Sequence, residues 1–133
     1  MNTHRSLSSH APQALRVLLA GGLLANGAAM LAAPATWYRS VPGVEFTGPF
    51  NPHFVRDIGA AYATAALGLA WRAWRGPIAA PAAQLGALFL LLHAAIHVGE
   101  TLAGICGWRT LLADVPGVIV PAALALGLAG GRR

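Results

Sequence analysis

Four long apolar runs dominate the chain and restrict the folds that it can adopt. They cover about residues 12–33, 53–74, 82–103 and 111–130. Each run is close to the roughly 20 residues that an α-helix needs to cross a hydrocarbon core of about 30 Å. Inside lipid every backbone amide and carbonyl must find a partner within the segment, which favours helices. The sequence therefore predicts an all-α fold, an integral membrane four-helix bundle that forms one transmembrane domain over residues 1–133.

The composition fits lipid better than water. Charged residues make up 10% of the chain and apolar residues 56%, whereas a soluble domain has about 25% charged residues. The nine basic residues are all arginines, scattered at the ends of the apolar runs and not gathered into a patch. We therefore expect the lipid bilayer as a partner and no nucleic acid. The single cysteine, Cys106, excludes an internal disulfide.

The arginines also predict an orientation. With the N-terminus inside, the inner side holds six of them: Arg5, Arg16, Arg72, Arg75, Arg132 and Arg133. The outer side holds Arg39, Arg56 and Arg109. Because arginine is enriched on the cytoplasmic side, we expect a multi-pass protein of the bacterial inner (plasma) membrane with both termini cytoplasmic. The first run exceeds the 7–15 apolar residues of a signal peptide, so it is expected to remain as a helix.

Residues 34–52 form the longest connection, an outer loop rich in proline and glycine. Proline fixes φ and glycine permits tight turns, so this loop is expected to be compact. Loops of this length are often functional. The short polar tail that contains Ser6, Ser8 and Ser9 is predicted to be disordered.

The third apolar run carries a polar stripe. His93, His97 and Glu100 have the spacing i, i+4 and i+7, which places them on one helix face. The second run begins with a similar pair, His53 and Asp57. Both groups would lie in the outer leaflet. If the two helices pack with these faces together, all five side chains would line one pocket.

Ionisable side chains inside a membrane are costly and usually mark a function. Imidazole and carboxylate groups together are ligands for zinc, iron or copper, so His53, Asp57, His93, His97 and Glu100 are candidate ligands of a transition metal. Haem would need a histidine pair shared by the second and third helices, and no CxxCH attachment motif is present. Two other readings stay open: a pocket for a proton, a quinone or a small molecule, and a structural hydrogen-bonded network without a ligand.

Part of the chain resembles a known group of proteins. The relevant stretches are Trp-Tyr-Arg at 37–39, Val-Pro-Gly-Val at 41–44 and Thr-Gly-Pro-Phe-Asn-Pro-His-Phe-Val-Arg-Asp-Ile-Gly at 47–59, followed by His93 and by His97 with Glu100. With its size and helix count, this run resembles small bacterial inner-membrane proteins similar to the DoxX-like group. That resemblance implies four membrane helices and a quinone-linked redox setting, since some of these proteins are subunits of quinone-linked oxidoreductases. It assigns no catalytic residue to this chain.

Together these patterns predict a small inner-membrane protein with a histidine and carboxylate pocket near the outer membrane face. The pocket would bind a metal or relay protons in a redox or quinone-linked context. One alternative is a non-catalytic structural subunit or scaffold of a membrane complex. Another is a small-molecule or ion transporter. A membrane-complex partner or a homo-oligomer would fit either role, and whether the protein is an enzyme stays open.

Overall fold

The computed structural model describes residues 4–130, with side chains from residue 11 onward. This part of the chain is helical and contains no strand. Its elements in order are α1 (His4–Ala32), α2 (Pro34–Ser40), η1 (Val44–Phe46), α3 (Pro52–Arg75), η2 (Gly76–Ala79), α4 (Ala80–Leu102), α5 (Trp108–Asp114), the π-helical segment η3 (Val115–Ile119) and α6 (Val120–Ala129). The predicted all-helical class is confirmed for these residues.

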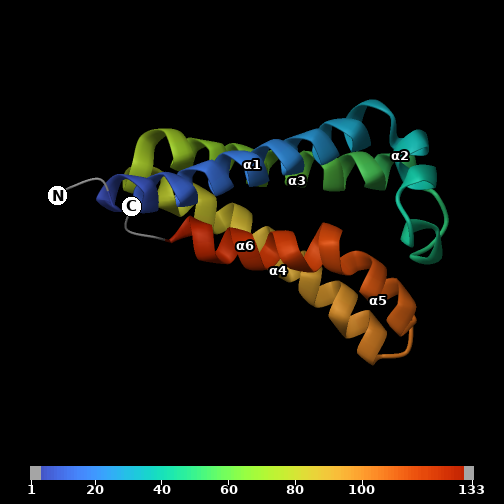
Figure 1. Ribbon diagram of the computed structural model, residues 1–133. Coiled ribbons are helices and arrows are strands. Elements are labelled where there is room, and N and C mark those ends of the chain that lie inside the picture. Colours follow the sequence, from blue (N-terminus) through green and yellow to red (C-terminus); the bar gives the residue numbers. More distant parts are fainter. Residues whose placement is uncertain (1–3, 131–133) are drawn as a thin grey trace.

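The long helices form two side-by-side pairs (Figure 1). Helix α1 packs along α3, and α4 packs along α6, while α3 and α4 join the two pairs. The pairs lie together where α1 begins and α6 ends, and they separate toward the opposite end. We call the first the terminal end; it also holds η2. The second, with α2, η1 and α5, is the loop end.

Among the described residues, three stretches are long and apolar enough to cross a membrane: Ala11–Ala32, Pro52–Leu102 and Trp108–Ala129. The middle stretch has 51 residues because α3, η2 and α4 follow one another without a non-helical break. It folds back on itself at η2 (Figure 1). The helices thus have the length and composition of membrane-spanning segments.

The helix bounds differ most from the sequence prediction at the N-terminus. Helix α1 begins at His4 and passes through Pro12, whereas the first apolar run begins only at about residue 12. The disordered tail was therefore a wrong prediction for residues 4–10. Helix α3 begins where expected, since the Asn51 side chain accepts hydrogen bonds from the amides of His53 and Phe54 at 3.0 and 3.2 Å.

Glycines mark the closest helix crossings. A Cβ on Gly59 would lie 2.7 Å from Met30 Cβ, and one on Gly68 would lie 2.6 Å from the Ala82 carbonyl oxygen. A Cβ on Gly86 would lie 2.9 Å from Ala65 Cα. The absent side chains let the helices approach, as in membrane helix pairs. Gly99 and Gly127, by contrast, would have no neighbouring atom within 4 Å of an added Cβ and mark no such crossing.

A buried arginine ties the first helix to the last near the terminal end. Arg16 is 4% exposed, and its Nε donates a hydrogen bond of 2.9 Å to the Leu128 carbonyl. That carbonyl lies near the C-terminus of α6, where the helix dipole favours a positive charge. Arg72 is also buried, at the end of α3.

Candidate functional site

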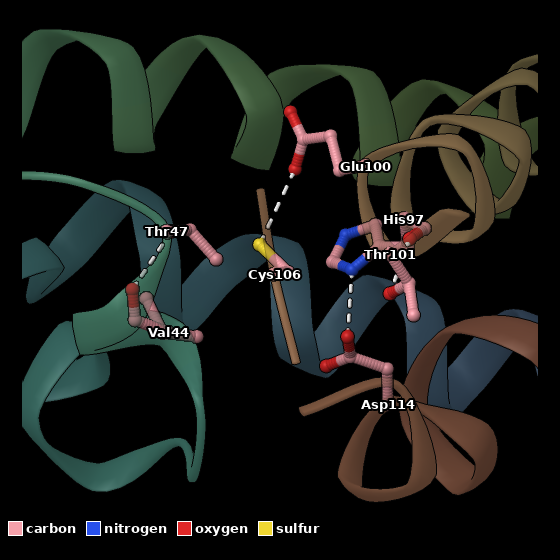
Figure 2. Close-up of polar contacts among 7 residues, drawn as sticks. All are labelled: Val44, Thr47, His97, Glu100, Thr101, Cys106 and Asp114. Atoms are coloured by element: carbon pink, nitrogen blue, oxygen red, sulfur yellow. Dashed lines mark hydrogen bonds and ion pairs between the residues drawn. The ribbon is translucent and has the colours of Figure 1, made fainter. Parts of the chain in front are cut away.

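A histidine and a carboxylate from different helices meet at the loop end (Figure 2). His97 on α4 places its Nδ1 2.7 Å from Oδ2 of Asp114, the last residue of α5. The side chains are 18% and 12% exposed. The bond therefore lies largely away from solvent, where a hydrogen bond between ionisable groups is stronger than at a surface. We call this contact the His97–Asp114 pair.

The local helix geometry fixes both partners. Thr101, one turn after His97, is buried and donates its hydroxyl to the His97 carbonyl at 3.0 Å. Asp114 is followed directly by the π-helical segment η3, and such segments often occur at functional sites. With Nδ1 engaged by a carboxylate, the proton stays on Nδ1 and the imidazole presents Nε2 as an acceptor. His97 is thus oriented to take up or release a proton at its other nitrogen.

His93 lies one turn deeper and contacts the same group. Its ring centroid is 4.8 Å from that of His97 and stacks on Phe89 at 5.9 Å with an interplanar angle of 24°. Tyr62 of α3 meets the His93 ring edge-on at 5.7 Å. The tyrosine is only 5% exposed. Two imidazoles in contact, one of them oriented by Asp114, and a buried tyrosine therefore form a continuous row between α3, α4 and α5.

Glu100 belongs to a different contact. Its Oε2 lies 3.7 Å from the Sγ of Cys106 (Figure 2), and its backbone carbonyl accepts the amides of Ile105 and Cys106 at 2.9 and 3.2 Å. Burial and the neighbouring Glu100 carboxylate raise the pKa of the Cys106 thiol. The Glu100 carbonyl therefore holds the turn after α4. The Cys106 thiol in this turn stays protonated at neutral pH.

His53 and Asp57 form a third, separate contact. His53 Nε2 lies 3.4 Å from Asp57 Oδ2, and the side chains are 86% and 61% exposed. They occupy the first turns of α3 at the loop end, where the two helix pairs have separated. This explains why the predicted meeting of His53 and Asp57 with the α4 histidines does not occur. The α3 side chain that does reach His93 is Tyr62.

The five predicted metal ligands thus fall into three places. His93 and His97 lie together, Glu100 faces Cys106, and His53 pairs with Asp57. Among residues 4–130, no group of three or more histidine, cysteine, aspartate and glutamate side chains is arranged to hold a metal ion. A transition-metal site stays a prediction without a supporting geometry.

The outer loop passes close to Asp114. Gly43 has φ +91, and a Cβ there would lie 3.6 Å from Thr110 Cγ2 and 3.9 Å from Asp114 Oδ1. The loop is held by Tyr38, which donates to the Gly48 carbonyl at 2.6 Å and packs on Phe50 with a ring separation of 5.2 Å. A tight glycine turn therefore lies beside the carboxylate that orients His97.

Sequence reasoning missed two members of the row. Asp114, the sole acid of the fourth apolar run, is not among the predicted site residues. Tyr62, in the second apolar run, is not among them either. Both could have been found by asking which polar residues on other helices lie at the depth of His93 and His97.

Comparisons with known protein families, curated proteins and solved structures found no match to this chain. The resemblance to the DoxX-like group is therefore neither supported nor opposed by them. Any function must be argued from the contacts themselves.

Proposed function

We propose that this chain is a small bacterial inner-membrane protein that relays protons between its outer face and a lipid-soluble molecule within the membrane. The observation that carries this proposal is the 2.7 Å contact between His97 and Asp114. A neutral imidazole can accept a proton at one nitrogen and release one from the other, which makes histidine a proton shuttle. The Asp114 carboxylate fixes the tautomer and stabilises the imidazolium that forms in transit.

The row Asp114, His97, His93 and Tyr62 supports an inward direction for the relay. Tyr62 is the eleventh residue of α3 counting from Pro52, which at 1.5 Å per residue corresponds to about 15 Å along the helix axis. That depth is about half of a hydrocarbon core of about 30 Å. The relay would thus end near the middle of the membrane.

Between this depth and the buried Arg16 and Arg72 near the terminal end, the helix interfaces are apolar. The next buried side chains toward the terminal end are Ala65, Leu69, Ala87 and Leu90. A row that stops among them suits a site delivering protons to a substrate inside the membrane. It does not suit the alternative of an ion transporter, which needs polar groups along a complete path.

The proposed orientation in the membrane follows from the arginines at the terminal end of the helices. The loop end would face outward and the terminal end, with Arg16, Arg72 and Arg75, would face the cytoplasm. The helices would cross as four spans, α1, α3, α4 and the α5–α6 unit. The Asp114 carboxylate would then lie near the outer aqueous phase, from which protons enter.

The DoxX-like resemblance suggests a quinone as the lipid-soluble molecule. Quinones dissolve in the membrane and take up protons when they are reduced. The electrons would come from a partner oxidoreductase of the same membrane, and this chain would serve as its proton-handling subunit.

The test uses the purified protein in nanodiscs with ¹⁵N-labelled histidine. Decylubiquinone, a short-tailed quinone, is titrated while the ring-nitrogen resonances of His93 and His97 are followed by NMR. We expect saturable shifts of both resonances, while His53 stays unchanged because it lies exposed in a separate contact. Unchanged His93 and His97 signals at saturating quinone would refute the relay to this class of substrate.

A matched variant sharpens this result. In Asp114→Asn the quinone should still approach, but the His97 response should weaken because its orienting carboxylate is gone. In Asp57→Asn the response should equal that of the wild type. Equal responses in both variants would separate quinone binding from the His97–Asp114 pair.

A non-catalytic scaffold subunit is the second candidate. It is favoured by the large apolar side chains exposed at the loop end, including Phe46, Ile105 and Trp108 at 71%, 73% and 63%. Co-purification tests it. A scaffold should lose its partner when residues 37–51 are altered and keep it in His93→Ala, whereas a proton-handling subunit should keep the complex and lose its function in His93→Ala.

A further inference from the structure

Tyr62 has a buried hydroxyl without a partner. The side chain is 5% exposed, yet within the described part of the chain no residue hydrogen-bonds with its hydroxyl. The same holds for the ring nitrogens of the adjacent His93. The polar atoms of these two groups are not completely excluded from the molecular surface. The two rings meet edge-on at 5.7 Å across the α3–α4 interface.

A hydroxyl in this position has no structural reason to be there. A buried polar group without a hydrogen bond destabilises the folded protein. Phenylalanine would make the same edge contacts with Phe89 and His93, which lie at 5.5 and 5.7 Å from the Tyr62 ring. The other tyrosine, Tyr38, shows the ordinary arrangement, since its hydroxyl donates to the Gly48 carbonyl.

We infer that Tyr62 and His93 form a binding site for the carbonyl group of a planar, apolar molecule that enters from the membrane. The tyrosine hydroxyl donates a hydrogen bond to the carbonyl oxygen. The stacked rings of Phe89 and His93 offer an aromatic surface for a planar ring. This inference rests on the proposed proton relay and deepens it, because it names the ligand class and places the ligand beside His93.

The roles within the row then divide. Asp114 orients His97, His97 and His93 carry the proton, and Tyr62 holds the carbonyl oxygen that receives it. Tyr62 is a binding residue, since its hydroxyl contacts the ligand directly. A neutral carbonyl fits better than a carboxylate, because the Asp114 carboxylate already acts electrostatically on Tyr62 and would repel a second negative charge.

The experiment compares Tyr62→Phe with Tyr38→Phe in nanodiscs. Affinity for decylubiquinone is measured by quenching of tryptophan fluorescence and by the histidine NMR titration. Decylbenzene, which has the ring and tail without carbonyls, serves as the control ligand. We expect Tyr62→Phe to bind decylubiquinone about three- to tenfold more weakly, the loss that corresponds to one neutral hydrogen bond. It should bind decylbenzene as the wild type does.

Stability separates a binding role from a structural one. Without ligand, Tyr62→Phe should melt at the same temperature as the wild type or higher, because an unpaired hydroxyl is removed. Tyr38→Phe should melt lower and bind the quinone unchanged. Unaltered quinone affinity in Tyr62→Phe, with the His93 and His97 shifts retained, would overturn this inference and leave the proton relay standing. Loss of all quinone responses in the wild type would overturn both.

Discussion

One ring nitrogen, Nδ1 of His97, determines how the candidate site can act. Because Asp114 occupies that nitrogen at 2.7 Å, the opposite nitrogen is the one left to exchange a proton with another group. The surrounding contacts are unequal in strength. The His97–Asp114 pair is mostly shielded, whereas the His53–Asp57 contact lies in solvent, where such contacts contribute little.

This contrast gives a prediction for Asp114. Replacing it by asparagine removes the charge from a shielded hydrogen bond, and we expect a loss of about 1–3 kcal/mol in the free energy of unfolding. The exposed Asp57→Asn variant should unfold as the wild type does. Thermal melts in the same detergent measure both. An Asp114→Asn variant as stable as wild type would mean that the pair does not persist in solution.

A second prediction concerns Cys106. Burial and Glu100 raise the pKa of its thiol, so at a fixed pH less thiolate is present and alkylation is slow. In Glu100→Gln the repulsion by the carboxylate is removed and the pKa falls. Iodoacetamide should then react several-fold faster at pH 8, and the rate should reach its half-maximum at a lower pH.

Glu45→Gln is the control for Glu100→Gln, because it removes the charge of a different acid, one that is exposed in the outer loop. Its alkylation profile should match the wild type. A shift of equal size in both variants would point to the overall negative charge of the loop end and not to Glu100.

For individual residues, the sequence predicted some of the side-chain contacts of the candidate site and missed others. The i, i+4 spacing of His93 and His97 placed both on one face, and their rings are in contact. The same spacing rule put Glu100 on that face, but the turn after α4 draws its carboxylate to Cys106. Contacts such as His97–Asp114 depend on how α4 and α5 meet, which local spacing does not encode.

Among the elements, the helix crossings depend on glycine. A Cβ on Gly68 would lie 2.6 Å from the backbone carbonyl of Ala82, and a backbone atom cannot move aside cheaply. We expect Gly68→Ala to destabilise the α3–α4 pair by about 1–3 kcal/mol through overpacking. Denaturant unfolding in mixed micelles measures the change.

Gly127→Ala is the matched control, since no atom lies within 4 Å of the added Cβ. This variant should be as stable as the wild type, or more stable by up to about 1 kcal/mol because alanine favours a helix. Equal losses in both variants would show that the effect comes from the helix backbone and not from the crossing.

The apolar runs predicted where the helices lie. The helix ends depend instead on capping side chains and glycine backbone conformations, which the apolar runs do not show. Asn51 sets the start of α3 by capping. Helix α3 ends at Arg75, and the following Gly76 has a φ of +68, which is accessible to glycine. The five-residue π-helical segment between α5 and α6 had no counterpart in the prediction, because a 3.6-residue period assumes regular α-helix throughout.

For the whole molecule, the ends of the helices make the proposed orientation testable. Two cysteine variants are made in a Cys106→Ala background. Glu45→Cys places a thiol in the outer loop. Ile78→Cys places one in η2, at a side chain that is 78% exposed. A membrane-impermeant maleimide should label Glu45→Cys in intact spheroplasts. It should label Ile78→Cys only after the membrane is opened.

The reverse labelling pattern would place both termini outside and would move Asp114 to the cytoplasmic face. The relay would then take its protons from the cytoplasm. Labelling of both variants without opening the membrane would contradict a membrane-spanning arrangement of α3 and α4.

Composition and run length were enough to predict an all-helical chain with membrane-length helices, because in lipid these two properties restrict the backbone more than any particular contact does. The pairing of α1 with α3 and of α4 with α6 was not predicted. It depends on small residues such as Gly59 and Gly86 meeting across interfaces, and such residues are spread over every run.

The bond between Arg16 and Leu128 has a consequence for how the protein is made. Arg16 and Leu128 are 112 positions apart in the chain. The ribosome therefore adds Arg16 long before Leu128, whose carbonyl accepts the hydrogen bond. Until the last helix packs against the first, the Arg16 guanidinium must find another acceptor, such as water. A chain truncated before α6 would lack the Leu128 carbonyl and leave the Arg16 guanidinium without this partner.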